Sequence, residues 1–69
     1  MKAQHQIVLD HLEKYGSISC SEAEKKYGIA RLHHRIMYLR NQGYNIKEEW
    51  RPREDRWGKT YPDLTYVLV

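Results

Sequence analysis

The sequence predicts an α+β domain in which three helices precede a C-terminal antiparallel sheet of two or three strands. Apolar residues recur at helical spacing as far as Gly43 and at every second position after it, so the chain is expected to change there from helix to strand. A chain of 69 residues also has room for only one hydrophobic core. Residues 1–69 are therefore expected to form one domain.

The first expected element is an amphipathic helix over residues 3–15. Val8, Leu12 and Tyr15 fall on one face of this helix, and polar residues take the other face. Gly16 can end the helix, because glycine adopts the left-handed backbone conformation that other residues resist.

A short extended segment at 17–19 and a second helix at 20–27 are expected next. Ser19 and Glu22 have the spacing of a capping box, in which each side chain accepts a hydrogen bond from a free backbone amide at the helix start. The second helix is expected to bury Tyr27.

Gly28 separates the second helix from a third, expected at 30–42 and closed by Gly43. Two short helices joined by a glycine-containing turn are typical of a helix-turn-helix. The apolar stripe of the third helix consists of Ile29, Leu32, Ile36 and Leu39. Its opposite face holds Ala30, Arg31, His34, Met37, Tyr38 and Asn41.

Two strands are expected at 44–50 and 64–69, where apolar and polar residues alternate. The expected core packs Leu12, Ala23, Leu32 and Ile36 against Ile46, Tyr66 and Leu68. The stretch 51–63 contains two prolines and a glycine, which favours a long loop. Trp57 in this loop is expected to fold back over the core.

The charged side chains are unevenly distributed. Residues 1–24 carry two basic and four acidic side chains, residues 25–47 carry six basic and no acidic ones, and residues 48–69 carry four basic and five acidic ones. A basic segment without acids is typical of a surface that meets phosphates. The alternative is an ordinary solvated helix face, although such faces usually alternate in sign.

Seven short stretches of the sequence form a recognisable set: Gly16-Ser-Ile-Ser, Glu22-Ala23, Tyr27-Gly28-Ile29, Arg31-Leu32, Arg35-Ile36, Leu39-Arg40 and Gly43-Tyr44-Asn45-Ile46. In these residues the chain resembles the small winged helix-turn-helix proteins that are common in bacteriophages and prophages. The resemblance covers residues 7–50 and, more weakly, the last strand. It implies a winged helix-turn-helix fold and a DNA-binding regulator in phage biology. The spacing of Ala23 and Gly28 places the turn in the winged class rather than the repressor class.

The third helix is expected to enter the major groove, where arginine can read guanine and asparagine can read adenine. Arg31 is the first candidate for a base contact, whereas Arg35 and Arg40 lie nearer the core and are expected to reach phosphates or to pack at the helix edge. The expected DNA contacts are Lys25, Lys26, Ala30, Arg31, His34, Arg35, Tyr38, Asn41, Arg51, Arg53, Arg56 and Lys59. For the last four, pairing with nearby acids is the alternative.

No catalytic residue, metal site or cofactor is expected. His33 and His34 are neighbours and would splay by about 100° on a helix, so they cannot easily share one ion. Cys20 lies near a helix start, where the helix dipole favours thiolate, but no base or oxyanion site can be placed beside it. As the only cysteine it cannot form an internal disulfide, which fits a reducing cytoplasm.

The sequence therefore predicts a cytoplasmic, phage or prophage transcriptional regulator that binds double-stranded DNA. One helix reads few base pairs, so pairing as a homodimer on a symmetric operator, or help from a second protein, is expected. Neither a membrane nor a small-molecule ligand is expected as a partner. The alternatives are a phage-encoded inhibitor that binds a host enzyme, and an excisionase-like architectural DNA binder.

Overall fold

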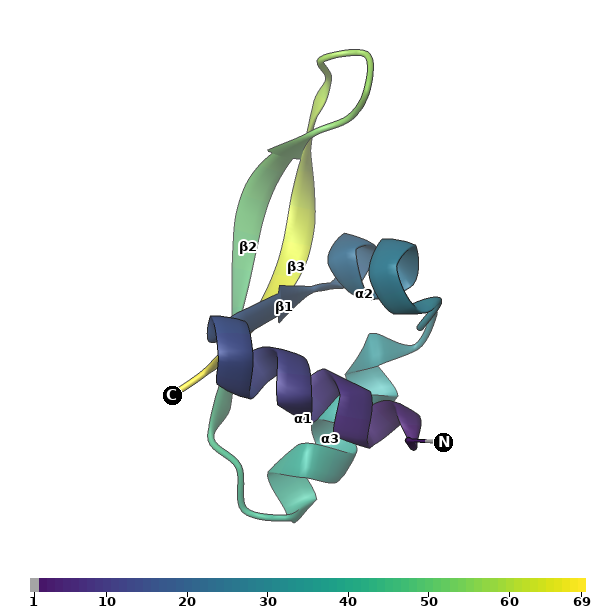
Figure 1. Ribbon diagram of the computed structural model, residues 1–69. Coiled ribbons are helices and arrows are strands. Elements are labelled where there is room, and N and C mark those ends of the chain that lie inside the picture. The colour runs from purple at the N-terminus through teal and green to yellow at the C-terminus, as the bar shows by residue number, and fades with distance from the viewer. Residues whose placement is uncertain (1) are drawn as a thin grey trace.

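The computed structural model describes residues 2–69 and contains three helices and three strands (Figure 1). In chain order they are α1 (Gln4–Tyr15), β1 (Ser17–Ser19), α2 (Cys20–Tyr27), α3 (Leu32–Asn41), β2 (Ile46–Glu54) and β3 (Thr60–Leu68). The strands form one antiparallel sheet in the order β1-β3-β2. The expected fold class, with a three-stranded sheet, is confirmed.

The helix ends follow from local sequence. Gly16 has a φ of 83° and its N–H donates to the Leu12 carbonyl at 2.7 Å, which closes α1. The Ser19 hydroxyl accepts a hydrogen bond from the Glu22 N–H at 3.0 Å, which caps α2. The Glu22 carboxylate lies 3.3 Å from Nε2 of His11, so the serine half of the expected capping box is the part that is seen.

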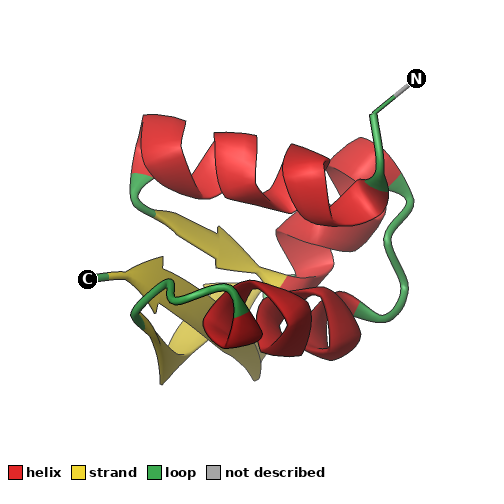
Figure 2. Cartoon of the chain, turned by 90° about the horizontal axis from the view of Figure 1, so that it is seen from below, coloured by secondary structure: helices red, strands yellow, loops and turns green. Residues whose placement is uncertain are grey.

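The core lies between the helices and the sheet. Figure 2 shows β1 running between α1 and the other strands. The buried apolar residues are Val8, Leu9, Leu12, Ile18, Ala23, Ile29, Leu32, Ile36, Leu39, Ile46 and Tyr66, with Leu68 packed against them. The expected core is therefore confirmed.

The expectation that the second helix buries Tyr27 was wrong, and Tyr15, on the apolar face of α1, also lies outside the core. Tyr15 is 57% exposed and Tyr27 is 38% exposed, because each is the last residue of its helix and lies at the rim of the core. The buried aromatic group between them is His11, which is 3% exposed and is hydrogen-bonded through Nδ1 to the Tyr27 hydroxyl at 2.7 Å. The Tyr15 ring lies 4.6 Å from the His11 ring and the Tyr27 ring packs edge-on against it, so both tyrosines cover the buried imidazole at the edge of the core.

The third helix begins at Leu32 rather than at Ala30, so the expected start was wrong. The N–H groups of Gly28 and Ile29 return to carbonyls of α2, which holds the chain against the end of that helix. Ala30 and Arg31 then turn the chain toward α3, and Arg31 occupies the N-cap position with φ −119° and ψ 58°. Both residues belong to the turn.

The long loop expected at 51–63 was also wrong. β2 and β3 pair as far as Glu54 and Thr60, which leaves residues 55–59 as the loop. Pro52 lies directly opposite Pro62. An antiparallel ladder tolerates this pair, because residues in its non-hydrogen-bonded positions contribute no N–H to the partner strand.

The hairpin tip is a tight turn organised by Asp55. Its carboxylate accepts hydrogen bonds from the N–H groups of Trp57 and Lys59, both at 2.9 Å. Gly58 takes a φ of 79°. Trp57 is 79% exposed, so the expectation that it packs on the core was wrong; the strands carry it too far out.

The outer part of the hairpin is a two-stranded ribbon. β1 pairs with residues 65–67 of β3, so residues 50–64 continue without a third strand. In Figure 1 this part of the hairpin extends beyond α2 and ends at the tip. We refer to residues 50–64 as the ribbon.

Candidate nucleic-acid interface

One flank of α3 packs on α1. Arg35 donates from Nε to the Gln4 side-chain oxygen at 3.1 Å, and the ring centroid of Tyr38 lies 4.3 Å from that of His5. Tyr38 is 45% exposed, so its ring remains accessible while leaning toward α1. Both expected contacts therefore lie at one edge of the exposed face of α3.

The other flank of α3 packs on the sheet. Arg40 donates from Nε and Nη2 to the Ile46 carbonyl, at 3.0 and 2.8 Å, and lies 3.4 Å from Glu48. Nδ1 of His33 lies 3.4 Å from the hydroxyl of Tyr66, which is fully buried. Of the two roles expected for Arg40, packing at the helix edge is the one seen.

Between these flanks, α3 presents an exposed face. His34, Met37 and Asn41 are exposed there, and Ala30 and Arg31 are exposed in the preceding turn. The structure thus brings together the turn and the outer face of α3, as the helical period indicated. Arg31 joins this surface from the N-cap position.

The basic residues divide according to their partners. Three of the expected contacts lie in ion pairs: Lys26 with Glu22 at 3.9 Å, Arg51 with Glu49 at 2.7 Å, and Arg53 with Asp63 at 2.7 Å. Hydrogen bonds from Arg51 and Lys47 lower the pKa of the Glu49 carboxyl. Within residues 2–69, the cations outside every ion pair are Lys14, Lys25, Arg31, Arg35, Arg56 and Lys59.

The two faces of the ribbon differ in chemistry. At the base of the hairpin, Glu48 and its cross-strand neighbour Tyr66 contact α3, so the alternation of side chains places Trp50 and Pro52 of the ribbon on the same face of the sheet. Arg51 and Arg53 lie on the opposite face, with Asp63, which contacts α2. The strand arginines therefore do not share a face with the residues that meet α3.

At the tip, the two cations are placed differently from the strand arginines. Arg56 lies over the Trp57 ring at 5.5 Å from its centroid, and Lys59 is exposed. Neither lies in an ion pair within the described part of the chain. Of the four expected contacts in the hairpin, these two have their charges unmatched.

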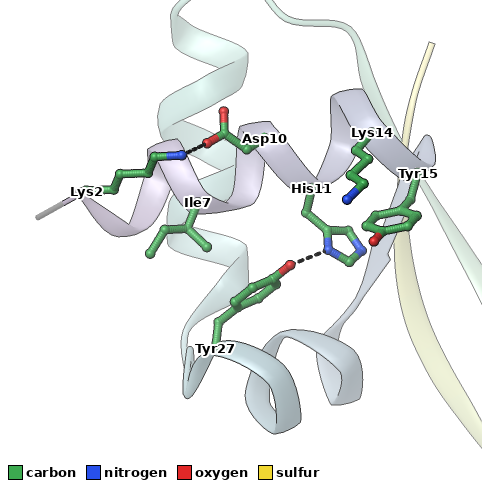
Figure 3. Close-up of a pocket in the computed structure, with 7 residues that line it drawn as sticks. All are labelled: Lys2, Ile7, Asp10, His11, Lys14, Tyr15 and Tyr27. Atoms are coloured by element: carbon green, nitrogen blue, oxygen red, sulfur yellow. Dashed lines mark hydrogen bonds and ion pairs between the residues drawn. The ribbon is translucent and has the colours of Figure 1, made fainter.

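A separate pocket of about 240 Å³ lies between α1 and α2 (Figure 3). Its lining residues are Lys2, Ile7, Asp10, His11, Lys14, Tyr15 and Tyr27. Nε2 of His11 is buried near Glu22 but makes no hydrogen bond within residues 2–69. No lining residue comes from α3, so this pocket is distinct from the turn and the exposed face of α3. Of its charged residues, Lys2 and Asp10 pair at 2.6 Å.

Among the buried polar residues, His11 and Asp63 were not expected from the sequence. His11 follows the period of the α1 apolar face, from Val8 to Leu12, which is the only signal that could have found it. Asp63 was assigned to a loop, and its role depends on contacts with α2 that span 42 positions in the sequence. Local patterns do not reveal such contacts.

Cys20 lies in the first turn of α2 and is partly buried. Burial, and secondarily the negative charge of Asp63, raises the pKa of its thiol, so the group stays protonated near neutral pH. This increase in the pKa of the thiol outweighs the decrease that the helix dipole at the start of α2 would cause. Within residues 2–69, no group of three or more histidine, cysteine or acidic side chains could hold a metal ion.

Three helices, a tight turn between the second and third, and a hairpin after the third define a winged helix-turn-helix protein, with the ribbon as its wing. The chain belongs to the winged helix-turn-helix domain family, which matches residues 3–69. This family suggests binding of duplex DNA and is typically non-enzymatic. Comparison with curated proteins and with solved structures finds no significant match. Among the described residues, no helix is long and apolar enough to cross a membrane.

Proposed function

We propose that this domain is a sequence-specific regulator that binds double-stranded DNA with α3 in the major groove. The observation that carries the proposal is the basic segment from Lys25 to Lys47, which contains no acid and runs from the end of α2 through the turn and α3 to the start of β2. Lys25, Arg31 and Arg35 are outside the ion pairs of the described chain, so their charges are available to phosphates or bases.

The contacts fall into two groups. Arg31, His34 and Asn41 are the proposed base contacts, because they lie at the turn or on the outer face of α3. Tyr38 would join them from the α1 side. The residues proposed to contact the phosphate backbone of the DNA are Lys25, Lys26, Ala30, Arg35, Arg56 and Lys59. Arg51 and Arg53 would first have to leave their carboxylate partners, so they are weaker candidates.

The proposed mechanism is occupancy of a regulatory site. Phosphate contacts position the domain, and α3 reads a few base pairs. Because one helix reads too little to select one site in a genome, two copies on a symmetric operator or a second protein complete the recognition. The resemblance to small phage and prophage proteins supports a role in phage gene regulation.

A protein target is the second candidate function. The face of the hairpin that meets α3 at Glu48 carries Trp50 and Pro52 in the ribbon and has no basic side chain on β2, so it would repel phosphates and suit a protein surface. A phage-encoded inhibitor of a host enzyme would use this face. Such a protein would bind duplex DNA weakly or not at all.

Selection from a pool of random duplexes, followed by a salt series on the selected duplex, tests the proposed function. We expect enrichment of a short motif and an affinity that falls steeply with salt. Absence of enrichment, together with absence of binding at low salt, would contradict the proposal and favour the protein target.

A further inference from the structure

Asp63 is a buried carboxylate at the point where the ribbon leaves the three-stranded sheet. It is 4% exposed. Along β3 in the direction of the tip, Thr65 is the last residue that pairs with β1, and Asp63 lies two positions further toward the tip. A two-stranded ribbon twists more freely than a larger sheet and is only marginally stable alone. Contacts near Asp63 therefore decide the direction in which the tip points.

The Asp63 carboxylate joins three elements. Its Oδ2 accepts a hydrogen bond from the Ser21 hydroxyl at 2.8 Å, and its Oδ1 accepts a long one from the Ser21 N–H at 3.4 Å. Ser21 lies in the first turn of α2, where backbone N–H groups lack partners within the helix. Arg53 of β2 reaches the same carboxylate from Nε at 2.7 Å.

The ion pair between Arg53 and Asp63 joins two residues that are not directly opposite each other in the sheet. The residue directly across from Asp63 is Arg51, which instead pairs with Glu49, whereas Arg53 lies across from Tyr61. The Arg53 guanidinium thus leans back along the ribbon toward its base. One carboxylate holds β2 on one side and α2 on the other.

We propose that Asp63 is a positioning residue that fixes the angle of the ribbon against α2 and thereby places the tip cations Arg56 and Lys59 on the DNA held by α3. This proposal rests on the proposed function. According to this proposal, Arg53 holds the Asp63 carboxylate through an ion pair within the protein and does not contact phosphate. Ser21 is the point of attachment on the helix-turn-helix.

The length of the ribbon makes this contact effective. Gly58 at the tip lies five residues from Asp63, about 17 Å along an extended strand. A tilt of about 10° at Asp63 would move the tip by about 3 Å, which is the length of a hydrogen bond. Losing the anchor therefore separates Arg56 and Lys59 from phosphates while α3 stays in place.

The test uses the full chain and two duplexes, a short one that spans only the site of α3 and a longer one that also lies under the tip. For the wild-type chain, two tip cations should make the log–log salt slope about 1.8 units steeper on the longer duplex. In Asp63→Asn this difference should fall close to zero while binding of the short duplex is kept. A purely structural role would weaken both duplexes together.

Glu54→Gln is the matched control, because it also removes one carboxylate from the ribbon. It should keep the full difference in salt slope between the longer and the shorter duplex. If Asp63→Asn does not fold, Ser21→Ala is measured in its place. It removes the 2.8 Å hydroxyl hydrogen bond to α2, leaves only the long bond from the backbone N–H, and keeps the Arg53 pair, so it should also reduce the difference in salt slope between the two duplexes. The proposal would be overturned if a folded Asp63→Asn or Ser21→Ala chain showed the same difference in salt slope between the two duplexes as the wild-type chain.

A measurement without DNA separates this proposal from the proposed function. Spin labels at Glu13→Cys and Lys59→Cys, in a Cys20→Ser background, report the distance between α1 and the tip by double electron–electron resonance. We expect a narrow distribution that broadens in Asp63→Asn. An unchanged distribution would overturn the positioning role, whereas a wild-type chain that binds neither duplex would overturn only the proposed function.

Discussion

Arg31 is the residue on which the proposed specificity depends most. It is exposed at the N-cap position of α3 and lies in no ion pair within residues 2–69, so its guanidinium can turn toward a guanine edge. We expect Arg31→Ala to cost about 1 to 3 kcal/mol on the selected duplex and much less on random duplex. Competition titrations measure both values.

Lys14→Ala is the matched control for Arg31→Ala, because it removes one unpaired charge from α1, outside the helix-turn-helix. It should leave the discrimination between the two duplexes unchanged. An Arg31→Ala chain with full discrimination and an unchanged circular dichroism spectrum would show that the base contacts lie elsewhere.

Cys20 allows a test of local burial. Because burial raises the pKa of its thiol, less thiolate is present near pH 8 than in a free cysteine. We expect iodoacetamide to alkylate Cys20 more slowly than free cysteine at this pH, with the rate rising as pH increases. Mass spectrometry follows the reaction, and alkylation at the rate of free cysteine or faster would contradict the expected shift.

Among the elements, both the helices and the hairpin were predicted, but the hairpin strands were predicted too short and the third helix two residues too early. The bounds of α2 follow from Ser19 and Gly28, which act on neighbouring backbone groups. The hairpin strands were drawn too short because Pro52 and Pro62 indicated a loop, whereas they face each other where the ladder needs no N–H. Cross-strand register is a long-range property that local composition does not reveal.

The same limit applied to the candidate site. The outer face of α3 followed from helical period, and His34 and Asn41 lie on it as expected. The pairing of Arg53 with Asp63 could not be foreseen, because it depends on register and on contact with α2. The sequence therefore indicated which residues are basic but not which charges are matched.

The hairpin tip is the element where a change should alter salt dependence most clearly. We expect Arg56→Ala with Lys59→Ala to flatten the log–log salt slope on random duplex by about 1.8 units, because both charges are unmatched. Arg51→Ala should flatten it by less than about 0.9 units, because Arg51 already pairs with Glu49. Fluorescence anisotropy across a salt series measures each slope.

Lys2→Ala with Lys14→Ala removes two charges from the N-terminal region and should leave that slope unchanged. A loss of about two units in Arg51→Ala with Arg53→Ala, with no loss at the tip, would show that the strand arginines make the backbone contacts.

At the scale of the whole molecule, the basic residues fall into two groups, those accompanied by acidic residues and those that are not. Acidic residues accompany the basic ones in α1 and in the hairpin, and the segment from Lys25 to Lys47 has none. This segment runs from the end of α2 through the turn and α3 to the start of β2, and its cations Lys25, Arg31 and Arg35 lie outside the ion pairs of residues 2–69. Binding of duplex DNA is the central claim that follows.

Titration of the wild-type chain with random duplex across a salt series tests this claim most directly. For roughly four phosphate contacts, the log–log slope should be about −3.6, and the affinity should fall by about 150-fold between about 50 and 200 mM salt. A titration that shows no binding at low salt, or an affinity that does not change across this range, would contradict it.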